Sequence, residues 1–195
     1  LGNFVSTPEV FGKYGSDASR QWAAAGGSTG TDIPFRWEDV EYGWRFQRKL
    51  WNACRFASMR LEDYNLTSEI ELELIDRWIL SKLQKTIDEC TEAMENCDFM
   101  NSTEKARNFI WHVFCDHYLE AAKTRLYGEG KGKLSAQYTL HKSIESMLKL
   151  IAPIIPHLSE EIWRIMYDPD KSIHISEWPM QSADLINIEA ERTGD

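Results

Sequence analysis

The spacing of apolar side chains predicts a chain made of long amphipathic helices. Within residues 42–61, small or apolar side chains recur every three or four positions, which places them on one face of a helix: Phe46, Leu50, Ala53, Cys54, Ala57 and Leu61. The same spacing continues over residues 74–94, 101–121 and 135–151. Four long antiparallel helices of this kind form a bundle, so the sequence predicts an all-α fold.

The third of these helices is predicted to begin and end at recognisable signals. Asn101 and Glu104 have the spacing of a capping box, and the apolar face that follows includes His117 and Ala121. Glycines at positions 128, 130 and 132 end the helix. Because glycines leave little to hold the backbone, we expect this turn to be mobile.

Shorter elements are predicted at both ends of the chain. Phe4 and Val5 have the character of a strand, and two short helices follow before a glycine-rich turn at residues 26–30. Pro156 begins a fifth, shorter helix. Residues 172–175 alternate like a strand, and the acidic end beyond them is expected to be loose. The predicted organisation is a small strand and helix appendage over residues 1–35, a helical bundle over 36–170 and a tail over 171–195.

The helix predicted over residues 42–61 carries a positive face opposite its apolar face. It holds five basic and no acidic residues, whereas residues 62–98 hold three basic and eleven acidic ones. Phe56 lies within this face, and an aromatic ring among arginines is a platform on which an unpaired base stacks. A merely solvated face, with Phe56 covered by a neighbouring helix, is the alternative. The polar residues of the face are Arg45, Arg48, Lys49, Asn52, Arg55 and Arg60.

A second basic group surrounds the glycine-rich turn after the third helix. It consists of Lys123, Arg125, Lys131 and Lys133. These charges suit contacts with the phosphates of a nucleic-acid backbone, although lysine-rich turns also serve solubility.

Composition restricts the classes of function. The 195 residues are 43% apolar, enough for the core of one large domain. The net charge of −9 excludes a protein that coats nucleic acid indiscriminately, so such a partner must meet a local basic patch. The four cysteines lack metal-site spacing, and no apolar run approaches the roughly 18 residues that span a bilayer. We expect a soluble cytoplasmic protein with no membrane partner, and the first residue, Leu1, suggests a piece of a longer polypeptide.

Cys115-Asp116-His117 is the one place where a nucleophile, an acid and an imidazole are adjacent. Consecutive residues of a helix point about 100° apart, so Cys115 and His117 are not expected to share a proton. His117 is instead expected in the core. We predict no catalytic residue and no metal site.

Several segments occur in an order that matches a known family. They are Leu1-Gly2-Asn3, Pro8-Glu9-Val10, Lys13-Tyr14-Gly15, Asp17-Ala18 with Arg20, Gly30-Thr31-Asp32-Ile33-Pro34-Phe35, Lys49-Leu50-Trp51-Asn52, Arg55-Phe56, Asp76-Arg77-Trp78-Ile79-Leu80, Phe114-Cys115-Asp116-His117-Tyr118-Leu119-Glu120 and Ala152-Pro153 through Trp163. Together they resemble class I aminoacyl-tRNA synthetases, most closely the archaeal type of valyl-tRNA synthetase, over nearly the whole chain. His117 departs from the pattern, in which an aromatic residue is expected.

The resemblance implies that residues 1–35 belong to the stem-contact region and that the bundle binds the anticodon. It implies a valine-specific tRNA as partner, with the arginine and the aromatic ring of residues 49–56 facing the anticodon loop. Taken with the two basic groups, the tRNA-binding residues that we predict are Arg45, Arg48, Lys49, Asn52, Arg55, Phe56, Lys123, Arg125, Lys131 and Lys133. The parent enzyme is then an ATP- and magnesium-dependent valine-tRNA ligase with catalytic and editing domains elsewhere in the polypeptide. This chain lacks the nucleotide-binding signatures, so we expect it to hold no cofactor and to be inactive alone.

Two alternatives stay open at the level of sequence. One is the equivalent region of an isoleucyl- or leucyl-tRNA synthetase. The other is an acidic helical scaffold that binds proteins, which net charge and amphipathic helices alone would permit. Steep salt dependence of RNA binding separates the scaffold from a tRNA-binding domain.

Overall fold

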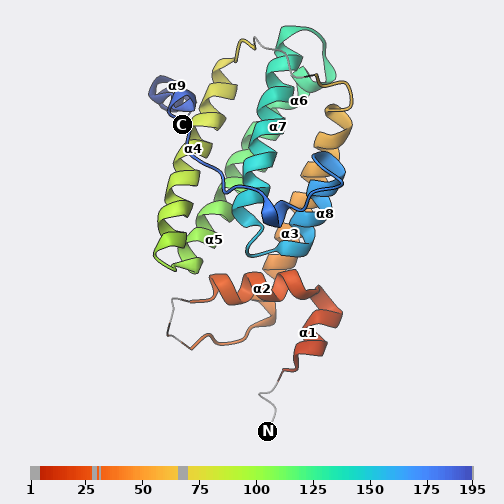
Figure 1. Cartoon of the computed structure of the whole chain (residues 1–195), viewed down its shortest axis with the longest axis vertical. Coiled ribbons are helices and arrows are strands. Elements are labelled where there is room, and N and C mark those ends of the chain that lie inside the picture. Colours follow the sequence, from red (N-terminus) through yellow and green to blue (C-terminus); the bar gives the residue numbers. More distant parts are fainter. Residues whose placement is uncertain (1–4, 28–29, 31, 66–69, 195) are drawn as a thin grey trace.

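Four long helical segments run side by side, and two short helices lie across one end of them (Figure 1). The computed structural model describes residues 5–27, 30, 32–65 and 70–194. The bundle consists of α3 (Trp37–Arg60), α4 (Leu74–Glu95), a continuous segment of α5 (Phe99–Asn108), η1 (Phe109–Tyr118) and α6 (Leu119–Tyr127), and α7 (Lys131–Ile151). The short helix α8 (Pro156–Met166) packs against α3 and α7.

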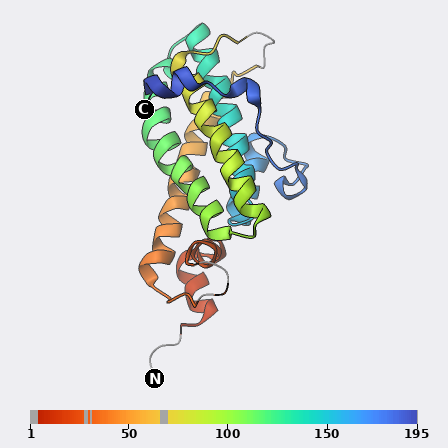
Figure 2. The same ribbon diagram turned by 90° about the vertical axis from the view of Figure 1, so that its left-hand side faces the viewer.

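The predicted bundle is confirmed, and along α3 its core is the one that the apolar spacing indicates. Along α3 the side chains of Phe46, Leu50, Ala53, Cys54 and Ala57 are all buried, and Leu61 is partly buried. Figure 2 shows the same segments from the side, with the end of the chain crossing near one end of the bundle. None of the described helices is long and apolar enough to cross a membrane.

The third segment begins before its predicted cap and ends, as predicted, at the first of the three glycines. Asp98, not Asn101, caps α5, because its carboxylate accepts a hydrogen bond from the backbone N–H of Asn101 at 3.1 Å. At the other end α6 stops at Tyr127 and α7 begins at Lys131, so Gly132 lies within a helix. Gly130 has a φ of 79°, a backbone conformation that glycine adopts without strain. The mobility of this turn stays a prediction.

The middle of the third segment, η1, is a π-helix of ten residues. A π turn bonds residues five apart, so each side chain advances around the axis by less than in an α-helix. The buried face consequently passes through Cys115, Tyr118 and Ala122, while His117 and Ala121 are exposed. The predicted burial of His117 and Ala121 is therefore wrong, because it assumed regular α-helical spacing.

The appendage is made of α1 (Thr7–Tyr14) and α2 (Ser16–Ala25). Two side chains of α2 attach it to the bundle by bonding backbone groups in the turn after α7 and at the start of α8. The buried carboxylate of Asp17 accepts hydrogen bonds from the N–H groups of His157 and Leu158, the latter at 2.8 Å, at the start of α8. Arg20 donates to the carbonyl oxygens of Pro153 and Ile154 at 2.9 and 3.1 Å. Both side chains thus hold the turn between α7 and α8.

No strand occurs among the residues that the structure describes, so the two predicted strands are not found there. Val5 is irregular, and Phe4 lies outside the described residues. The alternating segment at 172–175 instead contains the 3₁₀ turn η2 (Ile173–Ile175). A strand is stable only when it pairs with others in a sheet, and the described residues contain no strand for this segment to pair with.

The predicted loose tail is also wrong. After η2 the chain passes through the 3₁₀ turn η3 (Ala183–Leu185) and forms α9 (Ile188–Gly194), which packs on α4 (Figure 1). Ala190 is fully buried there, and the hydroxyl of Ser81 bonds both the carboxylate of Glu191 and, at 2.8 Å, the N–H of Asn187. Polar side chains of α4 therefore hold the tail together with apolar contacts, in which Trp178 and Leu185 pack against the core.

The carboxylate of Asp76, at the start of α4, connects α4 to the neighbouring segments of the bundle. Its side chain is 0% exposed and accepts hydrogen bonds from Tyr118 at 2.7 Å, from Arg125 at 2.6 and 2.9 Å, and from Ser135. These donors come from η1, α6 and α7. Burial, and then the charge of Asp76, raise the pKa of Tyr118 well above its ordinary value, so the phenol stays a donor.

We expect Asp76→Ala to lower the free energy of unfolding by about 3–5 kcal/mol, because it leaves the Arg125 guanidinium and the Tyr118 phenol without their acceptor. Urea unfolding followed by circular dichroism measures this. Glu120→Ala is the control, because it removes an exposed ion pair with Lys123, worth at most about 1 kcal/mol. Equal losses in the two variants would contradict a central role for Asp76.

Stability is also expected to fall as the pH drops below about 6.5, the ordinary pKa of histidine. Burial lowers the pKa of His141, which packs between Tyr64 and Tyr167, so the unfolded chain takes up the proton first. His141→Gln should therefore weaken the dependence of the melting temperature on pH between 7 and 5. An unchanged dependence would assign it to other groups.

Candidate nucleic-acid interface

The predicted positive face of α3 is solvent-exposed along most of its length. Arg45, Arg48, Asn52 and Arg55 are exposed, and they recur every three or four residues opposite the buried face. Lys49 lies at the edge of this row, where α3 meets η1. The structure therefore brings five of the predicted residues into one surface row.

Two cations of this surface are neutralised by neighbouring carboxylates. Arg45 pairs with Glu41 one turn earlier on α3, and Lys49 pairs with Asp116 of η1. The hydrogen bond from Lys49 holds the pKa of Asp116 below its ordinary value, so the carboxylate stays charged near neutral pH. An anionic ligand of Arg45 or Lys49 would have to compete with an existing partner.

Other arginines of the surface lie against aromatic rings instead of carboxylates. The guanidinium of Arg48 lies 4.7 Å from the centroid of the Trp44 ring. Arg60 lies 4.7 Å from the ring of Tyr127. Neither arginine, nor Arg55, has an ion pair within the described part of the chain. A ring orients a guanidinium without cancelling its charge, so these arginines keep hydrogen-bond donors for a further anion.

The side chain of Phe56 is neither fully exposed nor fully buried. Its ring is half-buried, packs against the core and meets the ring of Tyr127 edge to face, with centroids 6.1 Å apart. Tyr127 is 64% exposed. The aromatic surface open to a base at this end of α3 is therefore mainly that of Tyr127, with Phe56 supporting it and Arg60 beside both rings.

The second basic group does not form one continuous patch, because each of its members has a carboxylate partner. Lys123 pairs with Glu120, Lys131 with Glu71 at 3.6 Å, and Lys133 with Asp63. Arg125 forms an ion pair with the buried carboxylate of Asp76, so it stabilises the bundle. This group is consequently a weaker candidate for phosphate contacts than the arginines of α3.

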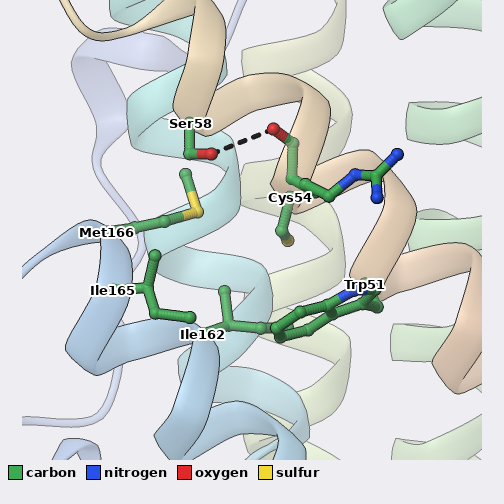
Figure 3. Close-up of a pocket in the computed structure, with 7 residues that line it drawn as sticks. Trp51, Cys54, Ser58, Ile162, Ile165 and Met166 are labelled. Carbon is green, nitrogen blue, oxygen red and sulfur yellow. Dashed lines mark hydrogen bonds between the residues drawn. The ribbon is translucent and has the colours of Figure 1, made fainter.

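A small apolar notch lies beside the exposed row, between α3 and α8. Figure 3 shows Trp51, Cys54 and Ser58 of α3 facing Ile162, Ile165 and Met166 of α8. Its volume is about 60 Å³, and Arg55 also lines it. The notch is too small to enclose a base, so it serves as the apolar border of the positive row.

A larger cleft lies elsewhere and is lined by more acidic than basic side chains. It measures about 1000 Å³ and lies between α4, η1 and α9. Glu73, Asp116 and Glu120 line it together with Lys82 and His117. Three carboxylates disfavour a polyanion there.

Cys115 and His117 lie in different environments on η1, because Cys115 is buried and His117 is exposed. Burial raises the pKa of Cys115 to about 12, so the thiol is not a nucleophile near neutral pH, while His117 is exposed to solvent. Within the described residues, no group of three or more histidine, cysteine or acidic side chains is arranged to hold a metal ion.

Sequence reasoning missed two members of this surface, Tyr127 and Arg107. Tyr127 ends α6 and reaches Arg60 of α3, and Arg107 near the end of α5 lies over the ring of Tyr42. Neither residue belongs to the periodic pattern of α3. The available signal was weak: Tyr127 is the last residue of α6, and Arg107 is one of two basic residues in the last turn of α5.

Comparison with known proteins agrees with this geometry. The family model described as the anticodon-binding domain of tRNA ligase matches residues 76–195. The chain is 41% identical over 196 residues to the valine-tRNA ligase of Methanothermobacter thermautotrophicus and 42% identical over 200 residues to that of Pyrococcus furiosus. Each alignment covers all of this chain and 22% of the relative, so the chain spans about a fifth of their length.

A solved structure has the same fold. It is the ternary complex LeuRS-tRNA-LeuAMS from Agrobacterium radiobacter K84, with a TM-score of 0.75 and 20% sequence identity, covering 96% of this chain and 22% of that one. Since the family model matches more than half of the residues, the chain belongs to the family of anticodon-binding domains of tRNA ligases.

Proposed function

We propose that this chain recognises the anticodon region of a tRNA as a non-catalytic part of a valine-tRNA ligase. The observation that carries the proposal is the surface of α3, where arginines without carboxylate partners lie beside an exposed aromatic ring in a chain of net charge −9. Single-stranded RNA is bound by this combination of charge and stacking. Membership of the anticodon-binding family supports the same function.

Within this proposal the tRNA is specific for valine, because both relatives named above are valine-tRNA ligases. The similarity to LeuRS concerns the fold alone, at 20% identity. ATP and magnesium would bind to catalytic domains outside this chain. The appendage formed by α1 and α2 would adjoin those domains. The cytoplasm, where tRNA is charged, is the proposed location.

The proposed tRNA-contacting residues are those predicted on α3, joined by Arg60 of the same face and by Tyr127, which the structure adds. Arg48, Asn52, Arg55 and Phe56 form the central part, and Arg60 and Tyr127 extend it towards the glycine turn. Arg45 and Lys49 flank the row in ion pairs. Lys123, Lys131 and Lys133 would contribute only long-range attraction, since each already has a partner.

We expect the chain to bind a valine tRNA transcript with an affinity that falls steeply with salt, because phosphate contacts release counterions. It should neither charge this tRNA nor exchange pyrophosphate into ATP with valine. Fluorescence anisotropy at several salt concentrations measures the binding. A transcript with an altered anticodon is the control, and equal binding of both would argue against anticodon recognition. Binding without salt dependence would favour a protein-interaction scaffold.

Tyr127→Ala should weaken tRNA binding by about 1–3 kcal/mol, the usual contribution of one stacked base, with little effect on stability because the ring is mostly exposed. Phe56→Ala should weaken binding too. It should also lower the free energy of unfolding, but by less than the roughly 3–5 kcal/mol expected for a fully buried phenylalanine. Affinity and thermal melting are measured on the same samples. A loss of stability without any loss of affinity in both variants would refute the stacking site.

A further inference from the structure

A polar cleft opens beside the first turns of α3, on the side of α5 and η1. Its volume is about 390 Å³, and it is lined by Tyr42, Asn101, Glu104, Lys105, Arg107, Asn108 and His112. Tyr42 lies one turn before Arg45, so the cleft continues the positive row of α3 towards the appendage. None of the other lining residues belongs to α3.

Arg107 is held in this cleft by a stack of rings. Its guanidinium lies 4.6 Å from the centroid of the Tyr42 ring, and Tyr42 in turn stacks on Trp111 of η1 at 5.4 Å, with only 3° between the ring planes. Lys49 lies 4.7 Å from the centroid of the Trp111 ring. Arg107 is therefore oriented by the stack, with the N–H groups at the edge of its plane left as donors.

The charges around Arg107 leave it the uncompensated cation of the cleft. Lys105 pairs with Glu89 at 3.0 Å, and His112 pairs with Asp116 at 3.1 Å. Glu104 is the one carboxylate of the lining, and no ion pair joins it to Arg107 within the described residues. Asn108 also lines the cleft, and its side-chain amide is a neutral hydrogen-bond donor.

We propose that Arg107 binds a phosphate of the tRNA backbone and that the ring of Tyr42 positions it to do so. A planar guanidinium matches a phosphate with two parallel hydrogen bonds, whereas a lysine acts as a point charge. The site lengthens the proposed RNA path from the anticodon contacts on α3 to the side formed by α5 and η1. This inference rests on the proposed function, because its ligand is the backbone of the same tRNA.

The test compares the salt dependence of tRNA binding in matched variants of the chain. Arg107→Gln should weaken binding and reduce the slope of log affinity against log salt by about 0.7–0.9, the value for one phosphate contact. Lys105→Gln removes the same formal charge two residues away, from a side chain already paired with Glu89, and should change the slope far less. Melting temperatures confirm that each variant is folded.

The role of Tyr42 is tested without changing any charge. Tyr42→Leu should reproduce part of the loss seen in Arg107→Gln, whereas Tyr42→Phe keeps the ring and should bind like the unaltered chain. Equal salt slopes for Arg107→Gln and Lys105→Gln would show that only the change in net charge matters, and would overturn the phosphate site. If the unaltered chain binds tRNA and Arg107→Gln leaves the salt slope unchanged, this inference is overturned and the proposed function is not. Absence of binding by the unaltered chain overturns the proposed function and this site with it.

Discussion

The buried carboxylate of Asp76 is the interaction on which the rest of the bundle depends. A charge without exposure to water is tolerated only when hydrogen bonds satisfy it, and Asp76 obtains them from Tyr118, Arg125 and Ser135. These partners lie 42, 49 and 59 residues away in the sequence. Satisfying one side chain therefore fixes the register of α4 against η1, α6 and α7 at the same time.

That register also decides which positive charges are available at the surface. Arg125 belongs by sequence to a basic cluster near the glycine turn, but Asp76 draws it into the bundle. The remaining lysines of that cluster find acidic partners on neighbouring segments. By contrast, Arg48 and Arg60 of α3 and Arg107 of α5 lie against aromatic rings, which orient their guanidinium groups without cancelling the charge.

The π-helix η1 shapes the border of this surface. Its wider turns place Trp111 against Tyr42 and Asp116 against Lys49, both on α3, while Phe114 and Tyr118 stay in the core. A regular α-helix would rotate these groups relative to one another. The π-helical segment therefore contributes both to the core and to the neighbouring polar surface.

The sequence by itself determined the helical class, the buried face of α3 and its positive row, because periodic apolar spacing and charge are properties of a single helix. It also carried the family resemblance. Only the tertiary structure decided that His117 is exposed, that the tail forms α9 on α4, and that Tyr127 and Arg107 join the α3 surface. The physical reason is that a charge or ring is available only if no distant partner covers or neutralises it. Such partners are set by packing between segments far apart in the chain, which local patterns do not encode.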